Sequence, residues 1–289
     1  MASSNDLPSA ATEGFKDASA YDAHRPSYPP EAVDAFLNSM KATGQSDVRI
    51  VEIASGTGKF TEQLASRPEQ FLIKAIEPHE TMRQKLSEKD LPAVEVVDGS
   101  ATKMPVDDEW GDACIAAQAF HWFATPDALH EIHRVLKPGA VFGMIWNVDD
   151  YNQPQTWEAS TKWERKLKDF VLSLDDGLPR FRHLKWKEVF ERQPPGNPLQ
   201  VVRDTLLDRL PKFSLPIGED SVRWTVWLSE DALWSRINTL SQIAVLKDQD
   251  RENAIKTFKA ALGGDDVERN EKGEIAAHGV TYFAWTDRI

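Results

Sequence analysis

VEIASGTGKF, residues 51–60, is the stretch that decides the fold. Its apolar start leads into a turn of small residues that contains two glycines, Gly56 and Gly58. Glycine tolerates left-handed backbone angles and lets the backbone approach a ligand closely. A glycine-rich turn directly after a strand is therefore typical of a nucleotide site. The apolar start also contains Glu52, whose burial is costly unless the carboxylate has a function.

Strand and helix patterns alternate on both sides of this turn. Apolar runs predict strands, in chain order, at 48–54, 71–77, 93–99, 112–119 and 141–146. Amphipathic segments between them predict helices on short loops. This order is typical of a doubly wound α/β fold with a mostly parallel sheet. Ligands of such sheets bind at the carboxyl ends of the strands, so the glycine turn is predicted to lie at a ligand site.

The alternation stops after Asn147, which predicts a second kind of structure in the later part of the chain. Residues 156–192 have a helical apolar stripe, and the last residues, 279–288, alternate as a strand. The predicted domains are a mobile tail at 1–20, an α/β core at 21–147, a largely helical cap at 148–212, and the remainder of the core with helices and the terminal strand at 213–289.

Composition narrows the class of protein. The 289 residues carry a formal net charge of -12, which repels nucleic acid, so we expect no nucleic-acid partner. The single cysteine, Cys114, excludes an internal disulfide and a cysteine-based zinc site. His130 and His133 lack a further ligand, so no metal is expected. We find no secretory leader and no apolar run of about 18 residues, and we expect a cytoplasmic protein that does not span a membrane.

Two classes of nucleotide-binding motif are excluded, each by a single residue. A dinucleotide fingerprint needs a third glycine where this chain has Thr61. A phosphate-binding P-loop needs a hydroxyl after the lysine, and Phe60 stands there. What remains is an acid followed by a tight Gly-x-Gly, formed by Glu52, Gly56 and Gly58. Glycine backbone can pass beside the amino-acid tail of a cofactor while the carboxylate accepts a hydrogen bond from its ammonium group.

This pattern resembles motif I of the class I S-adenosylmethionine-dependent methyltransferases. Ala54 stands where many such motifs carry a further glycine, and some branches of the family tolerate alanine there. "EIHRVLKPGAVF" at 131–142 resembles the methyltransferase-11 group. "YDAHRPSYP" at 21–29 together with "AQAFHWF" at 117–123 resembles the small-molecule subgroup that contains trans-aconitate methyltransferase and its fungal relatives. The terminal strand fits the seventh, antiparallel strand of that Rossmann-like sheet.

The resemblance implies S-adenosylmethionine as the cofactor. Glu77, at the end of the second strand, would accept hydrogen bonds from both ribose hydroxyls, and Asp98 with the adjacent backbone would hold the adenine amino group. Tyr21 and Arg25 belong to a segment that covers the cofactor in the subgroup. The predicted cofactor-binding residues are Tyr21, Arg25, Glu52, Ala54, Ser55, Gly56, Gly58, Glu77, Pro78, Met82, Asp98, Gly99, Ser100, Ala101, Gln118, Ala119 and Trp122.

The segment FHWF, residues 120–123, follows the fourth strand beside the expected sulfonium. Two interpretations stay open: an aromatic cluster that only packs, or a site in which His121 contacts the acceptor or acts as a base. The predicted reaction is in-line methyl transfer to a small molecule whose acceptor group is a carboxylate, a hydroxyl or an amine. A carboxylate acceptor would need no general base. One alternative is a cofactor-binding protein of the same fold without methyl transfer, such as a cyclase or a regulatory partner. A less favoured alternative is an NAD-dependent oxidoreductase.

Overall fold

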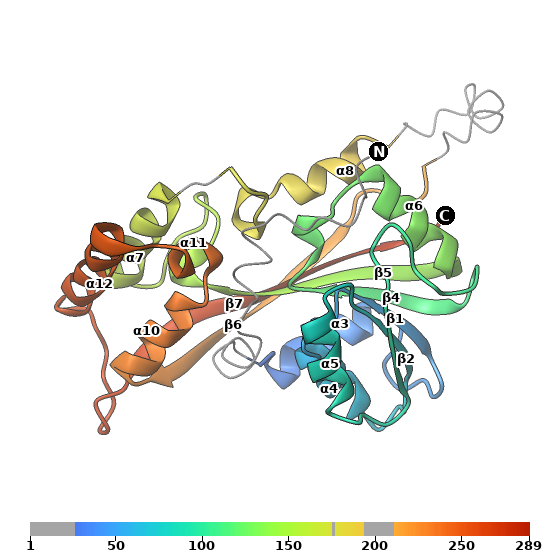
Figure 1. Ribbon diagram of the computed structural model, residues 1–289, viewed down its shortest axis with the longest axis horizontal. Coiled ribbons are helices and arrows are strands. Elements are labelled where there is room, and N and C mark those ends of the chain that lie inside the picture. Colours follow the sequence, from blue (N-terminus) through green and yellow to red (C-terminus); the bar gives the residue numbers. More distant parts are fainter. Residues whose placement is uncertain (1–26, 175–176, 194–210) are drawn as a thin grey trace. The chain divides into compact units, whose positions relative to one another are not determined.

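The computed structural model of the chain describes residues 27–174, 177–193 and 211–289 (Figure 1). Its strands form one seven-stranded sheet with the order β3-β2-β1-β4-β5-β7-β6. The pairs among the first five strands are parallel, and β7 is antiparallel. The strands are β1 Arg49–Ile53, β2 Leu72–Ile76, β3 Val94–Val97, β4 Gly111–Ala117, β5 Leu136–Asp149, β6 Gly218–Leu228 and β7 Ile275–Asp287. The predicted fold class, a doubly wound, mostly parallel seven-stranded sheet with an antiparallel terminal strand, is confirmed.

Strand β6 is not among the strands that the sequence patterns predict. From Val222 to Leu228 every second residue is half-buried and the residues between them are exposed. Its first four residues, GEDS, are polar apart from the glycine, and Trp227 is 40% exposed. This strand lies at the edge of the sheet and buries neither face fully. It therefore lacks the continuous apolar run that marks the inner parallel strands.

Helices connect most of the strands. They are α3 Pro30–Ser39, α4 Lys59–Ala65, α5 Glu80–Ser87, α6 Pro126–Val135, α7 Lys162–Ser173, α8 Glu188–Glu191, α10 Glu230–Asn238, α11 Ser241–Ala244 and α12 Asp248–Leu262. Short 3-10 helices are η1 Phe120–Trp122, η2 Asp150–Asn152, η3 Phe181–His183 and η4 Lys185–Lys187. Among the helices of the described ranges, none combines the length and the apolar character that a bilayer crossing requires.

The chain divides into two units, and each is described by itself. The described part of unit 1 consists of residues 27–29, 147–174, 177–184 and 221–281. The described part of unit 2 consists of residues 30–146, 185–193, 211–220 and 282–289. Unit 2 therefore contains β1 to β4 complete, together with the turns that follow them.

In unit 2, helix α3 packs closely against strand β5. The ring of Phe36 meets the rings of Phe60 and Phe283 edge-on, with centroids 5.9 and 5.7 Å apart. Gly143 of β5 faces the same helix, and a Cβ atom there would lie 2.7 Å from Cζ of Phe36 and would overlap Sδ of Met40. Glycine at this position therefore allows the helix to approach the strand.

Unit 1 has an apolar core of its own, to which α7, α10 and α12 contribute Trp163, Leu233 and Phe258. It also buries an ion pair in which Nη2 of Arg236 lies 2.7 Å from Oδ1 of Asp149. A buried charge is costly to desolvate unless an opposite charge compensates it, so removal of either partner would leave the other uncompensated.

The close packing of α3 on β5 gives a stability prediction. Gly143→Ala should lower the free energy of unfolding by about 1–3 kcal/mol, because the added methyl group overlaps the side chains of Phe36 and Met40. Gly263→Ala is the matched control, since a Cβ atom there would lie at an ordinary 3.7 Å from the Lys259 carbonyl oxygen. This control should stay within about 0.5 kcal/mol of the parent. Urea unfolding measures both variants, and equal losses would contradict the packing described above.

Candidate functional site

The carboxyl ends of the first four strands bring most of the predicted site residues to one edge of the sheet in unit 2. Ile53 at the end of β1 is in register with Ile76 of β2 and with Ala116 of β4. Ile76 is in turn in register with Val97 at the end of β3. Because parallel strands end at the same edge, the segments that follow them also meet there. In the sequence these segments are spread from the glycine turn to FHWF.

The turn after β1 has a left-handed backbone at three positions. The φ angles are 53° at Ala54, 60° at Gly56 and 84° at Gly58. A Cβ atom at Gly58 would overlap the side chain of Leu86, so the helix packing also requires glycine there. At Gly56 a Cβ atom would meet only Sδ of Met82, at 3.9 Å, so the space beside this glycine is open apart from that contact. Ala54 adopts the angles that a glycine would adopt without strain.

Glu77 connects the end of β2 to this turn. Its Oε2 accepts a hydrogen bond of 2.8 Å from the Gly56 N–H, and its Oε1 accepts one of 2.8 Å from the His79 N–H. Burial raises the pKa of Glu77 above its usual range, while these two donors lower it. Each carboxylate oxygen has two lone pairs, so each can accept one more hydrogen bond. This geometry suits a pair of hydroxyl groups on a ligand.

Glu52 is a second acid beneath the same turn, and its burial and hydrogen bonding differ from those of Glu77. Its side chain is 0% exposed, and within the described residues neither of its oxygens has a hydrogen-bond partner. The Thr61 hydroxyl is close enough to lower the pKa of Glu52, but it makes no hydrogen bond of normal geometry. Burial and the nearby charge of Glu77 raise the pKa of Glu52 to about 8. The unliganded protein therefore holds Glu52 mainly in its neutral form at pH 7.

The segment after β3 turns tightly. Gly99 is needed for packing, because a Cβ atom there would lie 2.7 Å from Cδ of Pro105 and 3.0 Å from Cγ2 of Ile76. The Ser100 N–H donates to the Lys103 carbonyl at 3.1 Å and closes the turn, and Ala101 is buried within it. This backbone reaches the same edge as the glycine turn.

Asp98 itself has an exposed side chain, with 72% of its surface accessible, and it forms an ion pair with Arg83 at 3.2 Å. Nη1 of Arg83 also donates to the carbonyls of Glu77 and Pro78, at 2.9 and 3.1 Å. Arg83 thus joins the ends of β2 and β3. The sequence patterns miss this residue, and the available signal was a basic side chain early in the helix that follows an acidic strand end.

The segment after β4 divides between core and edge. Gln118 has a left-handed φ of 59°, and its N–H donates to the Ile145 carbonyl at 2.8 Å. Ala119 and Phe120 are buried, whereas His121 and Trp122 are half-buried and have ring centroids 4.9 Å apart. Tyr21 and Arg25, which the sequence also assigns to the site, lie outside the described residues.

Trp146 of β5 is a further residue that the sequence patterns miss. Its indole Nε1–H donates to Nδ1 of His121 at 3.1 Å. It stands at the end of the predicted strand 141–146, beside the strand that carries FHWF. An aromatic residue at the carboxyl end of a neighbouring strand was the available signal.

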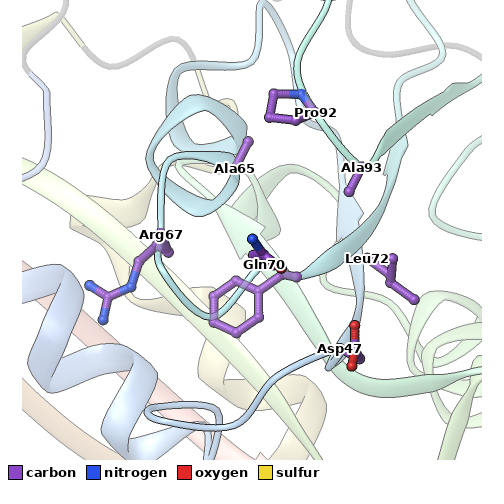
Figure 2. Close-up of a pocket in the computed structure, with 8 residues that line it drawn as sticks. Asp47, Ala65, Arg67, Gln70, Leu72, Pro92 and Ala93 are labelled. Atoms are coloured by element: carbon purple, nitrogen blue, oxygen red, sulfur yellow. The ribbon is translucent and has the colours of Figure 1, made fainter.

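A pocket in unit 2 lies away from this edge. It has a volume of about 340 Å³ and is lined by Asp47, Ala65, Arg67, Gln70, Phe71, Leu72, Pro92 and Ala93 (Figure 2). These residues precede or open β1, β2 and β3, so the pocket lies at the amino ends of these strands. Figure 2 shows the Arg67 side chain directed away from Pro92 and Ala93, and its guanidinium is paired with Asp34 and Glu69. We therefore assign the candidate site to the carboxyl edge.

The described residues include no group of three or more histidine, cysteine, aspartate or glutamate side chains that could hold a metal ion. The acidic groups of the candidate edge come from three different strands: Glu52 lies within β1, and Glu77 and Asp98 directly follow β2 and β3. Their partners are backbone N–H groups and Arg83, and Glu52 has no hydrogen-bond partner among the described residues. Carboxyl groups in this arrangement suit hydroxyl and cationic groups of a ligand.

Comparisons with known proteins point to one family. A family model described as a methyltransferase domain matches residues 51–144. An uncharacterised methyltransferase-like protein of Schizosaccharomyces pombe is 35% identical over 175 residues, which cover 60% of this chain and 63% of that protein. An uncharacterised methyltransferase of the same yeast is 30% identical over 262 residues, which cover 88% of this chain and 91% of the relative. An uncharacterised methyltransferase of Mycobacterium bovis is 28% identical, with 88% and 87% covered.

Solved structures share the fold at lower identity. A putative type II methyltransferase from Anaeromyxobacter dehalogenans aligns with a TM-score of 0.53 and 20% identity, covering 90% of this chain and 97% of that chain. A phosphoethanolamine N-methyltransferase of Haemonchus contortus, solved with phosphomonomethylethanolamine and S-adenosylhomocysteine, aligns with a TM-score of 0.53 and 14% identity. This alignment covers 100% of this chain and 61% of that chain. At such identities the likeness concerns the fold alone.

The left-handed angles of the turn give a first prediction about the site. Ala54→Gly should leave the free energy of unfolding unchanged or raise it by up to about 1 kcal/mol. The reason is that relief of a left-handed penalty of about 1–2 kcal/mol outweighs the greater freedom of glycine in the unfolded chain, about 0.5–1 kcal/mol. Gly56→Ala is the matched reverse change and should lower it by about 1 kcal/mol. Denaturant unfolding measures both, and a loss of stability in Ala54→Gly would contradict the angles described here.

The buried Glu52 gives a pH prediction. Its pKa is about 8 in the folded protein and ordinarily 4.5, so between these values the folded chain holds a proton that the unfolded chain has lost. The free energy of unfolding therefore falls as the pH rises through this window, and below the window Glu52 contributes no pH dependence. Glu52→Gln cannot ionise, so the parent should lose stability relative to this variant between about pH 5 and pH 8. Thermal unfolding without ligand measures the difference, and parallel curves would refute the assignment.

Proposed function

The chain belongs to the S-adenosylmethionine-dependent methyltransferases, and we propose that it transfers a methyl group to a small-molecule acceptor at the carboxyl edge of β1 to β4. The observation that carries this proposal is the glycine turn held by Glu77, with the unpartnered acid Glu52 beneath it. Family membership also excludes the alternative of an NAD-dependent oxidoreductase.

We propose that Glu77 receives the ribose of the cofactor. Its two oxygens are fixed by the N–H groups of Gly56 and His79, and each keeps one lone pair for a further donor. Two oxygens of one carboxylate match two neighbouring hydroxyl groups. The carboxylate would therefore meet the ribose without a change in its present hydrogen bonds.

Glu52 suits the cationic amino-acid tail of the cofactor. A buried carboxyl without a hydrogen-bond partner is costly in the unliganded protein, and a bound ammonium group would offset that cost. Ala54, Ser55, Gly56 and Gly58 form the backbone of the turn above it. The open space beside Gly56 is consistent with a tail that passes over this glycine.

The adenine contacts stay predictions supported by position. Asp98 with the turn Gly99, Ser100 and Ala101 follows β3 at the same edge, and Pro78 with the buried Met82 follows β2. The ion pair with Arg83 holds the Asp98 side chain beside the end of β2. Tyr21 and Arg25 stay predicted contacts from outside the described residues.

At the methyl end we propose that Gln118, Ala119 and Trp122 line the cofactor and that His121 contacts the acceptor. S-adenosylmethionine supplies a methyl group on a sulfonium, which is already a good leaving group. The residues of the protein therefore contribute chiefly alignment and exclusion of water. The half-buried rings of His121 and Trp122 at the end of β4 are suited to both tasks.

Several finer predictions also belong to this proposal. Membership of the trans-aconitate methyltransferase-like subgroup, a carboxylate, hydroxyl or amine as acceptor, and a cytoplasmic location follow from the sequence patterns. The predicted domains, with a core at 21–147 and a cap at 148–212, likewise stay predictions. The labelled-donor experiment below distinguishes this proposal from the alternative, a protein of the same fold that binds the cofactor without methyl transfer.

Calorimetry with S-adenosylhomocysteine tests the cofactor site. Glu77→Gln should weaken binding about tenfold to a hundredfold, because hydrogen bonds to a charged group are worth about 1.5–3 kcal/mol. Glu80→Gln, at an exposed position three residues later, is the matched control and should bind as the parent does. An absence of binding by the parent would end the proposal.

Methyl transfer itself is tested with a cell extract and donor labelled in the methyl group. Mass analysis should show labelled small molecules in the extract with the parent protein that are absent when buffer replaces the protein. Binding of the cofactor without labelled product across extracts and acceptor panels would favour the alternative without transfer.

A further inference from the structure

The contact between Trp146 and His121 restricts what His121 can do. The indole Nε1–H of Trp146 lies 3.1 Å from Nδ1 of His121. Indole nitrogen is a donor only, so the imidazole nitrogen that faces it must be the acceptor. A neutral imidazole has one N–H, and with Nδ1 as the acceptor the proton is on Nε2. The identity of the donor therefore sets the tautomer of His121.

The indole that makes this contact is held rigidly. Trp146 is fully buried in β5, and its ring lies 4.8 Å from the ring of Trp186 at an interplanar angle of 35°. The Tyr282 ring lies 6.1 Å from it on β7. A ring packed on its neighbours in this way cannot turn its N–H elsewhere without disruption of the core. The donor to His121 is thus a fixed part of unit 2.

Protonation of His121 is opposed by the same contact. An imidazolium has donors at both nitrogens, so its Nδ1–H would face the Trp146 N–H and the hydrogen bond would be lost. The alternative neutral tautomer, with the proton on Nδ1, meets the same conflict. Since Nδ1 accepts from Trp146, a general base would need a lone pair on Nε2, and Nε2 has one only in that disfavoured tautomer.

We propose that Trp146 is a positioning residue that holds His121 as the Nε2–H tautomer, so that His121 donates a hydrogen bond to the methyl acceptor and does not remove a proton from it. This inference rests on the proposed function for the role of His121, while the tautomer can be measured without any substrate. A hydrogen-bond donor suits an acceptor that arrives already deprotonated. It does not suit an alcohol, which must lose a proton to a base as it attacks.

Nitrogen NMR on the unliganded protein tests the tautomer. In protein labelled with ¹⁵N-histidine, His121 should show an Nε2–H and an unprotonated Nδ1 at neutral pH, with the signals assigned by their loss in His121→Gln. Trp146→Phe removes the donor and should bring the Nδ1–H tautomer or the imidazolium into view. Trp163→Phe, at a buried tryptophan of unit 1, is the matched control and should leave these signals unchanged. A parent protein with Nδ1 protonated would overturn the proposal.

Rescue by glutamine tests the role of the donor in turnover. The side-chain amide of His121→Gln can place an N–H near the former Nε2 but cannot act as a base. His121→Ala should lower kcat/KM about tenfold to a hundredfold, as expected for loss of one hydrogen bond that binds and aligns a charged acceptor. His121→Gln should recover most of that loss. Equal, severe losses in both variants would show that His121 is a base and would refute the proposal.

The two proposals fail in different ways. If the parent binds no S-adenosylhomocysteine and transfers no methyl group, the proposed function fails, while the NMR result still decides the tautomer. If the parent transfers methyl groups and both variants of His121 bind the cofactor normally, the comparison of glutamine with alanine decides the role of the donor.

Discussion

The hydrogen bond from the Gly56 N–H to Oε2 of Glu77 is the interaction on which the rest of the site depends. It ties the turn after β1, whose backbone is left-handed at Ala54, Gly56 and Gly58, to the end of β2. Loss of this hydrogen bond would leave one oxygen of a buried carboxylate without its donor. The glycines of the turn, the packing of Gly58 on Leu86 and the position of Glu77 are therefore one constraint.

The two buried acids of this edge differ in how far hydrogen bonds compensate the cost of their burial. Glu77 has backbone donors on both oxygens, whereas the oxygens of Glu52 have no hydrogen-bond partner among the described residues. Since the charge of Glu77 also raises the pKa of Glu52, ionisation of one acid opposes ionisation of the other. A cation placed between them would relieve both effects at once. The free protein therefore keeps Glu52 protonated, and a cationic ligand would favour its ionised form.

The sequence allowed prediction of the sheet and of the residues that follow its strands, because apolar runs and turn residues are local signals. Glu52, Gly56 and Glu77 could be brought together from the rule that parallel strands end at one edge. Strand β6 could not be predicted, since a half-exposed edge strand has no continuous apolar run. Arg83 and Trp146 were missed because their roles depend on partners that follow other strands, Asp98 after β3 and His121 after β4. The left-handed angle at Ala54 explains why glycine is common at this point of the motif.

The contrast between motif residues and missed residues has a physical basis. Residues that hold a common cofactor follow the strand ends in a fixed order, so a short pattern describes them. The orientation of His121 depends instead on Trp146, and through it on Trp186 and Tyr282, which lie far apart in the sequence. Tyr282 in turn shares a hydrogen bond with Glu219, which also pairs with Lys187. Because the proposed acceptor end is built from this packing and not from a motif, a change in the aromatic core would alter the orientation of His121 without any change in the glycine turn.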